Sequence, residues 1–193
     1  NSSVDGNFPN HHPDPTVLKN NIQISKLVQE QNCDLGISFD GDGDRLGIID
    51  NNGQFVYSDI VLLLISKFMS LTIKDLTVVA DVKCSQILFD DLKNHNINVL
   101  MSKTGHSLIK KKIKETNAHI AGEMSGHMFF NHDYYGFDDA LYVAARLIQL
   151  LSRTEKKLSE LKSKIPVYYS TPEMRLEAEN DEEKFRISKE AID

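Results

Sequence analysis

The stretch Leu35-Gly-Ile-Ser-Phe-Asp-Gly-Asp-Gly-Asp-Arg-Leu-Gly-Ile-Ile49 sets three carboxylates and a guanidinium between two short apolar runs. The apolar runs predict a strand that enters a loop and a second strand that leaves it. The carboxylates of Asp40, Asp42 and Asp44 repel one another, and the glycines between them allow the positive φ angles that turn these side chains toward one point. Because converging oxygen ligands suit a hard cation, we expect a Mg2+ site here rather than a solvated acidic turn.

Two other kinds of acidic site share part of this pattern. An EF-hand loop that began at Asp40 would need Gly at its sixth position and Glu at its twelfth, where this chain has Arg45 and Asn51. A strand-end aspartate that accepts a phosphoryl group, with Asp42 assisting, is chemically reasonable. The third aspartate and Arg45 fit a cation held beside a phosphate better, because a guanidinium can bind phosphate through two hydrogen bonds.

The composition limits the class of protein. The chain has 193 residues, 40% of them hydrophobic, which is enough for one or two cores. Its net charge of -6 argues against nucleic-acid partners, and no apolar run approaches the ~20 residues that span a bilayer. Cys33 and Cys84 fit reduced thiols in a cytoplasmic protein, although one disulfide stays possible. The chain begins at Asn1 without a preceding element, so we expect a piece of a longer protein.

Hydrophobic periodicity predicts the strands and helices. Strands alternate with helices from residue 77 onward, which is typical of an α/β fold with a mostly parallel, mixed sheet whose ligands gather at the carboxyl ends of the strands. The predicted strands cover 35–39, 46–50, 55–57, 77–82, 98–102 and 119–122, and a strand-like segment covers 167–177. The predicted helices cover 17–31, 60–71, 85–94, 106–116, 139–152 and 158–164, with Ser58 and Asp59 as the expected N-cap of the second.

Candidate anion-binding groups follow two of these strands. Lys83 comes just after the strand that begins at residue 77 and could offer its ammonium group to a phosphate, although strand-end lysines are usually only solvated. Lys103 and His106 flank the start of the helix 106–116, where free N–H groups favour an anion, and His106 can move protons near neutral pH. Local evidence leaves open a second interpretation, in which Thr104 or Ser107 merely caps this helix.

The loop after the third strand of this series has sugar-binding chemistry. Glu123 and Ser125 lie two residues apart between glycines, and a carboxylate beside a hydroxyl suits the recognition of adjacent sugar hydroxyls. A simple turn with an exposed glutamate explains the same residues equally well. Asp138 or Asp139 is expected to cap the helix 139–152, and His127 is interpreted as a loop histidine because its spacing to other histidines suggests no metal site.

Together these motifs resemble the bacterial phosphomannomutase/phosphoglucomutase enzymes of the α-D-phosphohexomutase family. The resemblance extends over most of residues 5 to 150, in the order and spacing of the family, and the combination is highly specific. The matching segments are Asp5-Gly-Asn-Phe-Pro-Asn-His-His-Pro-Asp-Pro15, Phe39-Asp-Gly-Asp-Gly-Asp-Arg45, Asp81-Val-Lys-Cys84, Lys103-Thr-Gly-His-Ser-Leu-Ile-Lys-Lys-Lys112, Gly122-Glu-Met-Ser-Gly-His127 and Gly136-Phe-Asp-Asp139.

The resemblance implies a four-domain enzyme in which a phosphoserine of the first domain gives its phosphoryl group to a hexose phosphate. A glucose or mannose 1,6-bisphosphate turns over in the cleft and returns the other phosphate to the serine. The roles implied for this chain fall into three groups. They are Mg2+ binding by Asp40, Asp42 and Asp44, catalytic help from Arg45, Lys83 and His106, and substrate binding by Lys103, Glu123 and Ser125.

The chain also departs from the family pattern. The serine loop, typically Thr-Ala-Ser-His-Asn-Pro, and the carboxyl-terminal phosphate-gripping loop are both absent from this sequence. We expect the end of the second domain at 1–54, the third domain at 55–165 and the start of the fourth at 166–193, without the first domain and most of the fourth. Such a fragment alone is expected to be inactive. The alternatives are a phosphoglucosamine mutase-like relative and a non-catalytic module that binds sugar phosphate or metal.

Overall fold

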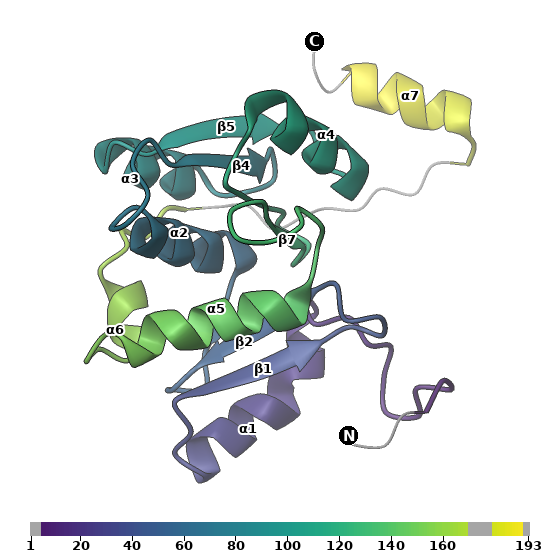
Figure 1. The fold of residues 1–193 in the computed structure, drawn as a ribbon. Helices are drawn as coiled ribbons and strands as arrows, with labels where there is room; N and C mark the ends of the chain where they lie inside the picture. Colours follow the sequence, from purple (N-terminus) through teal and green to yellow (C-terminus); the bar gives the residue numbers. More distant parts are fainter. Residues whose placement is uncertain (1–4, 170–178, 191–193) are drawn as a thin grey trace.

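The computed structural model describes residues 5–169 and 179–190 and arranges them around two sheets (Figure 1). The first sheet has the order β1-β2-β3, and the second has the order β5-β4-β6-β7. Helices α2 (Ser58–Met69) and α5 (Ala140–Ser152) lie between the sheets and contact both of them. The two sheets therefore share one large apolar core.

The first sheet presents the acidic loop. Its strands β1 (Leu35–Phe39), β2 (Leu46–Asp50) and β3 (Phe55–Val56) are all antiparallel. Phe39 pairs with Leu46, so residues 40–45 form the loop of a hairpin. The middle strand, β2, is buried along its whole length because α1 (Ile22–Glu30) contacts it from one side and α2 and α5 contact it as well. The loop thus extends from a rigid, fully packed strand.

The second sheet is mixed. Strands β4 (Thr77–Asp81), β5 (Asn98–Ser102) and β6 (Ile120–Gly122) are parallel, and β7 (Met128–Phe130) pairs antiparallel with β6. Helix α3 (Gln86–Asn94) packs with α2 and α5 in the large core, and α4 (His106–Thr116) packs on a smaller core with Val79. Because β4, β5 and β6 are parallel, the loops at their carboxyl ends lie at one edge of the sheet.

The α/β class predicted from periodicity is confirmed, and several elements coincide with their predicted limits. The strand 98–102 and the helix 106–116 are β5 and α4. The helix predicted over 60–71 begins earlier, at Ser58, because Tyr57 has the extended backbone of an N-cap residue. The helix predicted over 17–31 splits into the short 3-10 helix η1 (Leu18–Asn21) and α1.

Other parts of the fold differ from the prediction. The strands of the first sheet are all antiparallel, whereas tandem α/β domains with mostly parallel, mixed sheets were expected. Periodicity also misses β7, a short buried strand that turns residues 123–127 into a hairpin loop. No strand forms at 167–169, and the rest of the segment predicted at 167–177 lies outside the described residues. Helix α7 (Asp181–Glu190) was not expected, and the domain limits at 54 and 165 stay predictions.

The short helix α6 (Leu158–Ser163) fastens the far end of β2. Asp50 is 1% exposed, and one of its carboxylate oxygens accepts a hydrogen bond from Lys162 Nζ at 2.7 Å. The backbone N–H of Ser159 donates to Asn51 Oδ1 at 3.1 Å.

Across residues 5–169 and 179–190, every helix is too short or too polar to cross a membrane.

Replacing Lys162 with Met is expected to lower the free energy of unfolding by about 1–3 kcal/mol, because one oxygen of a buried carboxylate loses its charged donor. Lys164→Met removes an exposed amine at the end of the same helix and is expected to change stability by less than about 0.5 kcal/mol. Urea unfolding measures both values. Equal stability of the two variants would contradict a fastening role for the ion pair.

Candidate functional site

Asp40 organises the hairpin loop from within. Its side chain is 2% exposed, and Oδ1 accepts hydrogen bonds from the backbone N–H groups of Gly43, Asp44 and Arg45 at 3.0–3.1 Å. The other oxygen, Oδ2, accepts a hydrogen bond from Arg45 Nε at 2.7 Å. Although burial alone would raise the pKa of Asp40, the hydrogen bonds from Arg45 hold it below its usual value. Asp40 is therefore a charged carboxylate that sets the shape of the loop.

The three aspartates of the loop converge. Ligand oxygens of Asp40, Asp42 and Asp44 all lie within 4.8 Å of one another, with Asp42 exposed. Asp44 Oδ1 is buried and accepts no hydrogen bond from the described residues. Burial, followed by the nearby carboxylate of Asp40, raises the pKa of Asp44. An all-oxygen set that contains an unsatisfied buried oxygen fits a hard divalent cation such as Mg2+.

Arg45 lies among carboxylates beside this loop. Besides Asp40, its guanidinium faces Asp14 Oδ2 at 3.7 Å and Asp44 Oδ1 at 3.9 Å. The side chain is 26% exposed. Burial alone lowers the pKa of Arg45, but its carboxylate neighbours raise it above the usual value. The guanidinium of Arg45 is thus fixed next to the acidic loop by three carboxylates.

The acidic loop packs against the β6–β7 hairpin of the second sheet. Leu46 N donates to Gly126 O at 3.3 Å, and Arg45 forms an isolated β-bridge with His127. Gly126 permits this approach because it has no Cβ, which would lie 3.1 Å from Leu46 O, and its φ of 100° is one that other residues rarely adopt. The backbone N–H of Ala140, in α5, donates to Gly43 O at 3.1 Å. The predicted metal loop and the predicted sugar loop therefore meet in one site.

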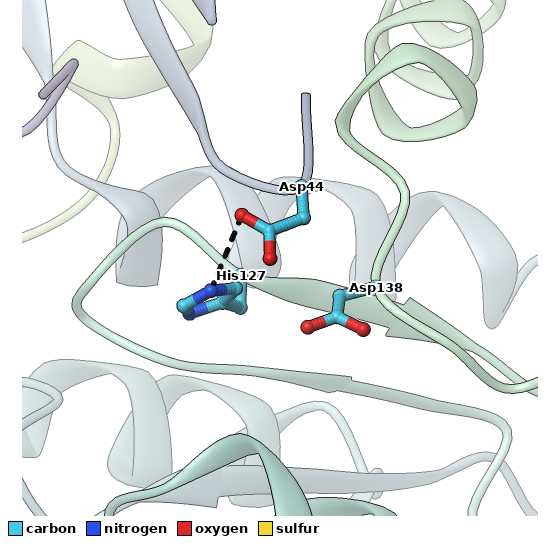
Figure 2. Close-up of side chains that lie close together, drawn as sticks. All are labelled: Asp44, His127 and Asp138. Atoms are coloured by element: carbon cyan, nitrogen blue, oxygen red, sulfur yellow. Dashed lines mark ion pairs between the residues drawn. The ribbon is translucent and has the colours of Figure 1, made fainter. Parts of the chain in front are cut away.

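His127 contacts both loops. The spacing of the histidines in the sequence gives no sign of these contacts. Nε2 lies 3.4 Å from Asp44 Oδ1, and Nδ1 lies 3.2 Å from Glu123 Oε2 and 2.9 Å from Ser125 Oγ. Figure 2 shows Asp44, His127 and Asp138 close together, with the ion pair between the first two as a dashed line. Burial alone lowers the pKa of His127, but Glu123 and Asp44 raise it above the usual value.

Asp138 forms a cluster with Asp44 and His127, in which ligand atoms of all three residues lie within 4.8 Å of one another. Its carboxylate pairs with Lys110 Nζ at 2.7 Å, and its backbone bridges to Phe129 of β7. The neighbouring residue, Asp139, is the N-cap of α5, since its side chain accepts a hydrogen bond from Tyr142 N at 2.9 Å. Of the two candidate N-cap residues, Asp139 therefore caps α5, and Asp138 faces the site.

Glu123 is held inside the protein rather than exposed on a simple turn. It is 2% exposed, and Oε1 accepts a hydrogen bond from Gly105 N at the start of α4, at 2.6 Å. Burial alone would raise the pKa of Glu123, but hydrogen bonds from His127 and Gly105 hold it below the usual value. Ser125, the second predicted sugar ligand, faces His127. Glu123 thus joins the loop after β6 to the loop after β5.

The predicted anion-binding residues line the same edge of the sheet. Lys83, Lys103 and His106 are exposed, and the ring of His106 lies 6.2 Å from that of His127, centroid to centroid. The N-cap of α4 is Gly105, which has no side chain, so neither Thr104 nor Ser107 occupies that position. The roles of these residues, like those of the three aspartates, remain predictions.

The mixed α/β sheet and the converging acidic loop are described above, and comparison with known proteins gives the family. The family model described as phosphoglucomutase/phosphomannomutase, alpha/beta/alpha domain III matches residues 57–169, and the model for domain II matches residues 1–53. These matches cover nearly the whole chain. The chain belongs to the phosphoglucomutase/phosphomannomutase family.

Several relatives are similar over most of this chain. A phosphomannomutase/phosphoglucomutase of Pseudomonas putida is 46% identical over 184 residues, which are 95% of this chain and 40% of the relative. A phosphoglucomutase of Neisseria gonorrhoeae is 42% identical over 90% of this chain and 37% of its own. A crystal structure of a phosphoglucomutase/phosphomannomutase family protein from Burkholderia thailandensis matches with a TM-score of 0.83 at 42% identity. This match covers 88% of this chain and 37% of the other chain. The chain spans about two fifths of the relatives it matches.

Asp40 and Asp42 are expected to differ in their effects on folding. Without divalent cations, Asp40→Ala should lower the free energy of unfolding by about 2–3 kcal/mol, because several loop N–H groups lose a charged acceptor. Asp42→Ala, the matched control on an exposed residue of the same loop, should change stability by less than about 0.5 kcal/mol. Urea unfolding in the presence of a chelator makes the comparison. Equal losses would show that Asp40 does not organise the loop.

Proposed function

We propose that the full-length protein is a phosphohexomutase that interconverts hexose 1-phosphate and hexose 6-phosphate through a phosphoserine and a 1,6-bisphosphate intermediate. The observation that carries this proposal is the convergence of Asp40, Asp42 and Asp44 beside Arg45, packed against the loop of Glu123 and His127. Membership of the family supports it, as do relatives named for both mannose and glucose phosphates. In this proposal the enzyme is an intramolecular phosphotransferase, that is, an isomerase.

The chemistry required is mainly positioning and charge neutralisation, because the transferring phosphoryl group carries its charge on its oxygens. Asp40, Asp42 and Asp44 would hold Mg2+, which supplies positive charge beside the phosphoserine. Arg45 keeps its guanidinium next to that site through its pairs with Asp40 and Asp14.

The other side chains act on the sugar phosphate. In this proposal Lys83 and His106 stabilise charge or move protons near the transferring group, and Lys103 attracts a phosphate at the start of α4. Glu123 and Ser125 accept hydrogen bonds from sugar hydroxyls, which requires them to exchange some of their present contacts with Gly105 and His127.

The partners that follow from this function are small molecules and the rest of the enzyme. They are hexose phosphates, glucose or mannose 1,6-bisphosphate, Mg2+, and the first and fourth domains of the full-length protein. The coverage of about two fifths of each relative is consistent with such missing domains. We place the enzyme in the cytoplasm, where these sugar phosphates are metabolised.

The full-length protein is expected to convert mannose 1-phosphate or glucose 1-phosphate to the 6-phosphate in a Mg2+-dependent manner. Asp42→Asn should lower kcat at least about 100-fold, because it weakens a ligand set that offsets phosphoryl charge. Asp34→Asn, at an exposed position outside the site, serves as the matched control and should retain activity. A coupled assay for the 6-phosphates measures the rates. Unchanged activity and Mg2+ dependence in Asp42→Asn would refute the metal assignment.

The 193-residue chain alone is expected to have no mutase activity, because its sequence lacks the serine loop that donates the phosphoryl group. The same coupled assay, run at high protein concentration with added glucose 1,6-bisphosphate, tests this expectation. Turnover by the purified chain would contradict it, and circular dichroism provides the control that the chain is folded.

A further inference from the structure

Asp81 lies at the point where the three loops of the site diverge. It is the last residue of β4, which runs between β5 and β6 in the second sheet. It pairs in register with Ser102 at the end of β5, and the preceding Ala80 pairs with Gly122 at the end of β6. Asp81 is 0% exposed. A buried carboxylate at this position can reach the loops on both sides of its own strand.

The carboxylate of Asp81 contacts all three loops. Oδ1 accepts hydrogen bonds from the backbone N–H and the thiol of Cys84, at 3.2 and 3.1 Å, in the turn that follows β4. Oδ1 also accepts a hydrogen bond from Met124 N, in the loop after β6, at 3.4 Å. Oδ2 accepts a hydrogen bond from Thr104 Oγ1, in the loop after β5, at 3.1 Å. One side chain thus joins segments that lie far apart in the sequence.

The contact with Thr104 extends to the proposed sugar ligand. The next residue, Gly105, donates its N–H to Glu123 Oε1 at 2.6 Å, and Glu123 is followed directly by Met124, which bonds back to Asp81. Asp81, Thr104, Gly105, Glu123 and Met124 therefore form a closed ring of hydrogen bonds and peptide links. Displacing Thr104 changes the position of Glu123 through this ring.

We propose that Asp81 is a positioning residue, which fixes the loops after β4, β5 and β6 so that their side chains face a common sugar phosphate. The loops carry Lys83, Lys103 and Glu123, so this role rests on the proposed function. If Asp81 only stabilised its own turn, the two hydrogen bonds from Cys84 would suffice, and its bonds to Thr104 and Met124 would have no consequence. A buried carboxylate shared by three loops makes their positions interdependent.

The test uses the full-length protein and begins with Thr104→Val, which removes the hydroxyl at nearly constant volume. Hydrogen–deuterium exchange should increase about tenfold in residues 122–127 as well as in 103–108, since one hydrogen bond to a buried carboxylate is lost. KM for the hexose 1-phosphate should rise more than kcat falls. Thr116→Val, which removes a hydroxyl that donates to Lys112 O within α4, is the matched control and should leave both loops unchanged.

A double-mutant cycle with Asp81→Ala, checked for folding by circular dichroism, tests the connection itself. Because alanine removes the oxygen that accepts from Thr104, adding Thr104→Val to it should cause much less additional exchange in 122–127 than in the wild type. Additive effects, or exchange confined to 103–108, would overturn the proposal. The exchange data do not depend on turnover, so a protein without mutase activity would disprove the function while still testing the role of Asp81.

Discussion

The mutual repulsion of three aspartates is the constraint on which the site depends, and Asp40 resolves it. Asp40 turns inward, where three backbone N–H groups and the guanidinium of Arg45 neutralise it. The loop can then hold Asp42 and Asp44 close by without a large electrostatic penalty. The cost that remains appears at Asp44, where burial and the nearby carboxylate of Asp40 raise the pKa. A bound cation would offset this repulsion.

The same hairpin also determines how the two sheets fit together. At one end of β2, Leu46 N donates to Gly126 O in the β6–β7 loop, and Gly43 O of the acidic loop accepts a hydrogen bond from Ala140 N of α5. At the other end, Asp50 pairs with Lys162 of α6. Since α2 and α5 fill the space between the sheets, the strand that carries the loop is fixed along its length. The predicted metal loop from one sheet and the predicted sugar loop from the other are therefore held together in one site.

Much of this arrangement follows from local sequence, and the rest depends on tertiary contacts. Strand β5 and helix α4 have regular periodicity and were predicted to the residue. Strand β7 is too short for a periodic signal, so the hairpin that brings His127 to Asp44 could not be predicted. The converging aspartates follow from their spacing and glycines, but the inward turn of Asp40 does not. It arises because the folded loop directs its backbone N–H groups at one oxygen, which composition cannot reveal.

The most direct test of the acidic loop as a cation site is a crystal structure of the protein with Mn2+, a carboxylate-binding ion that can be located by its anomalous scattering. The account predicts one strong anomalous peak at about 2–2.3 Å from carboxylate oxygens of Asp40, Asp42 and Asp44. A peak among Asp44, His127 and Asp138 with none in the loop, or no peak at saturating Mn2+, would contradict it.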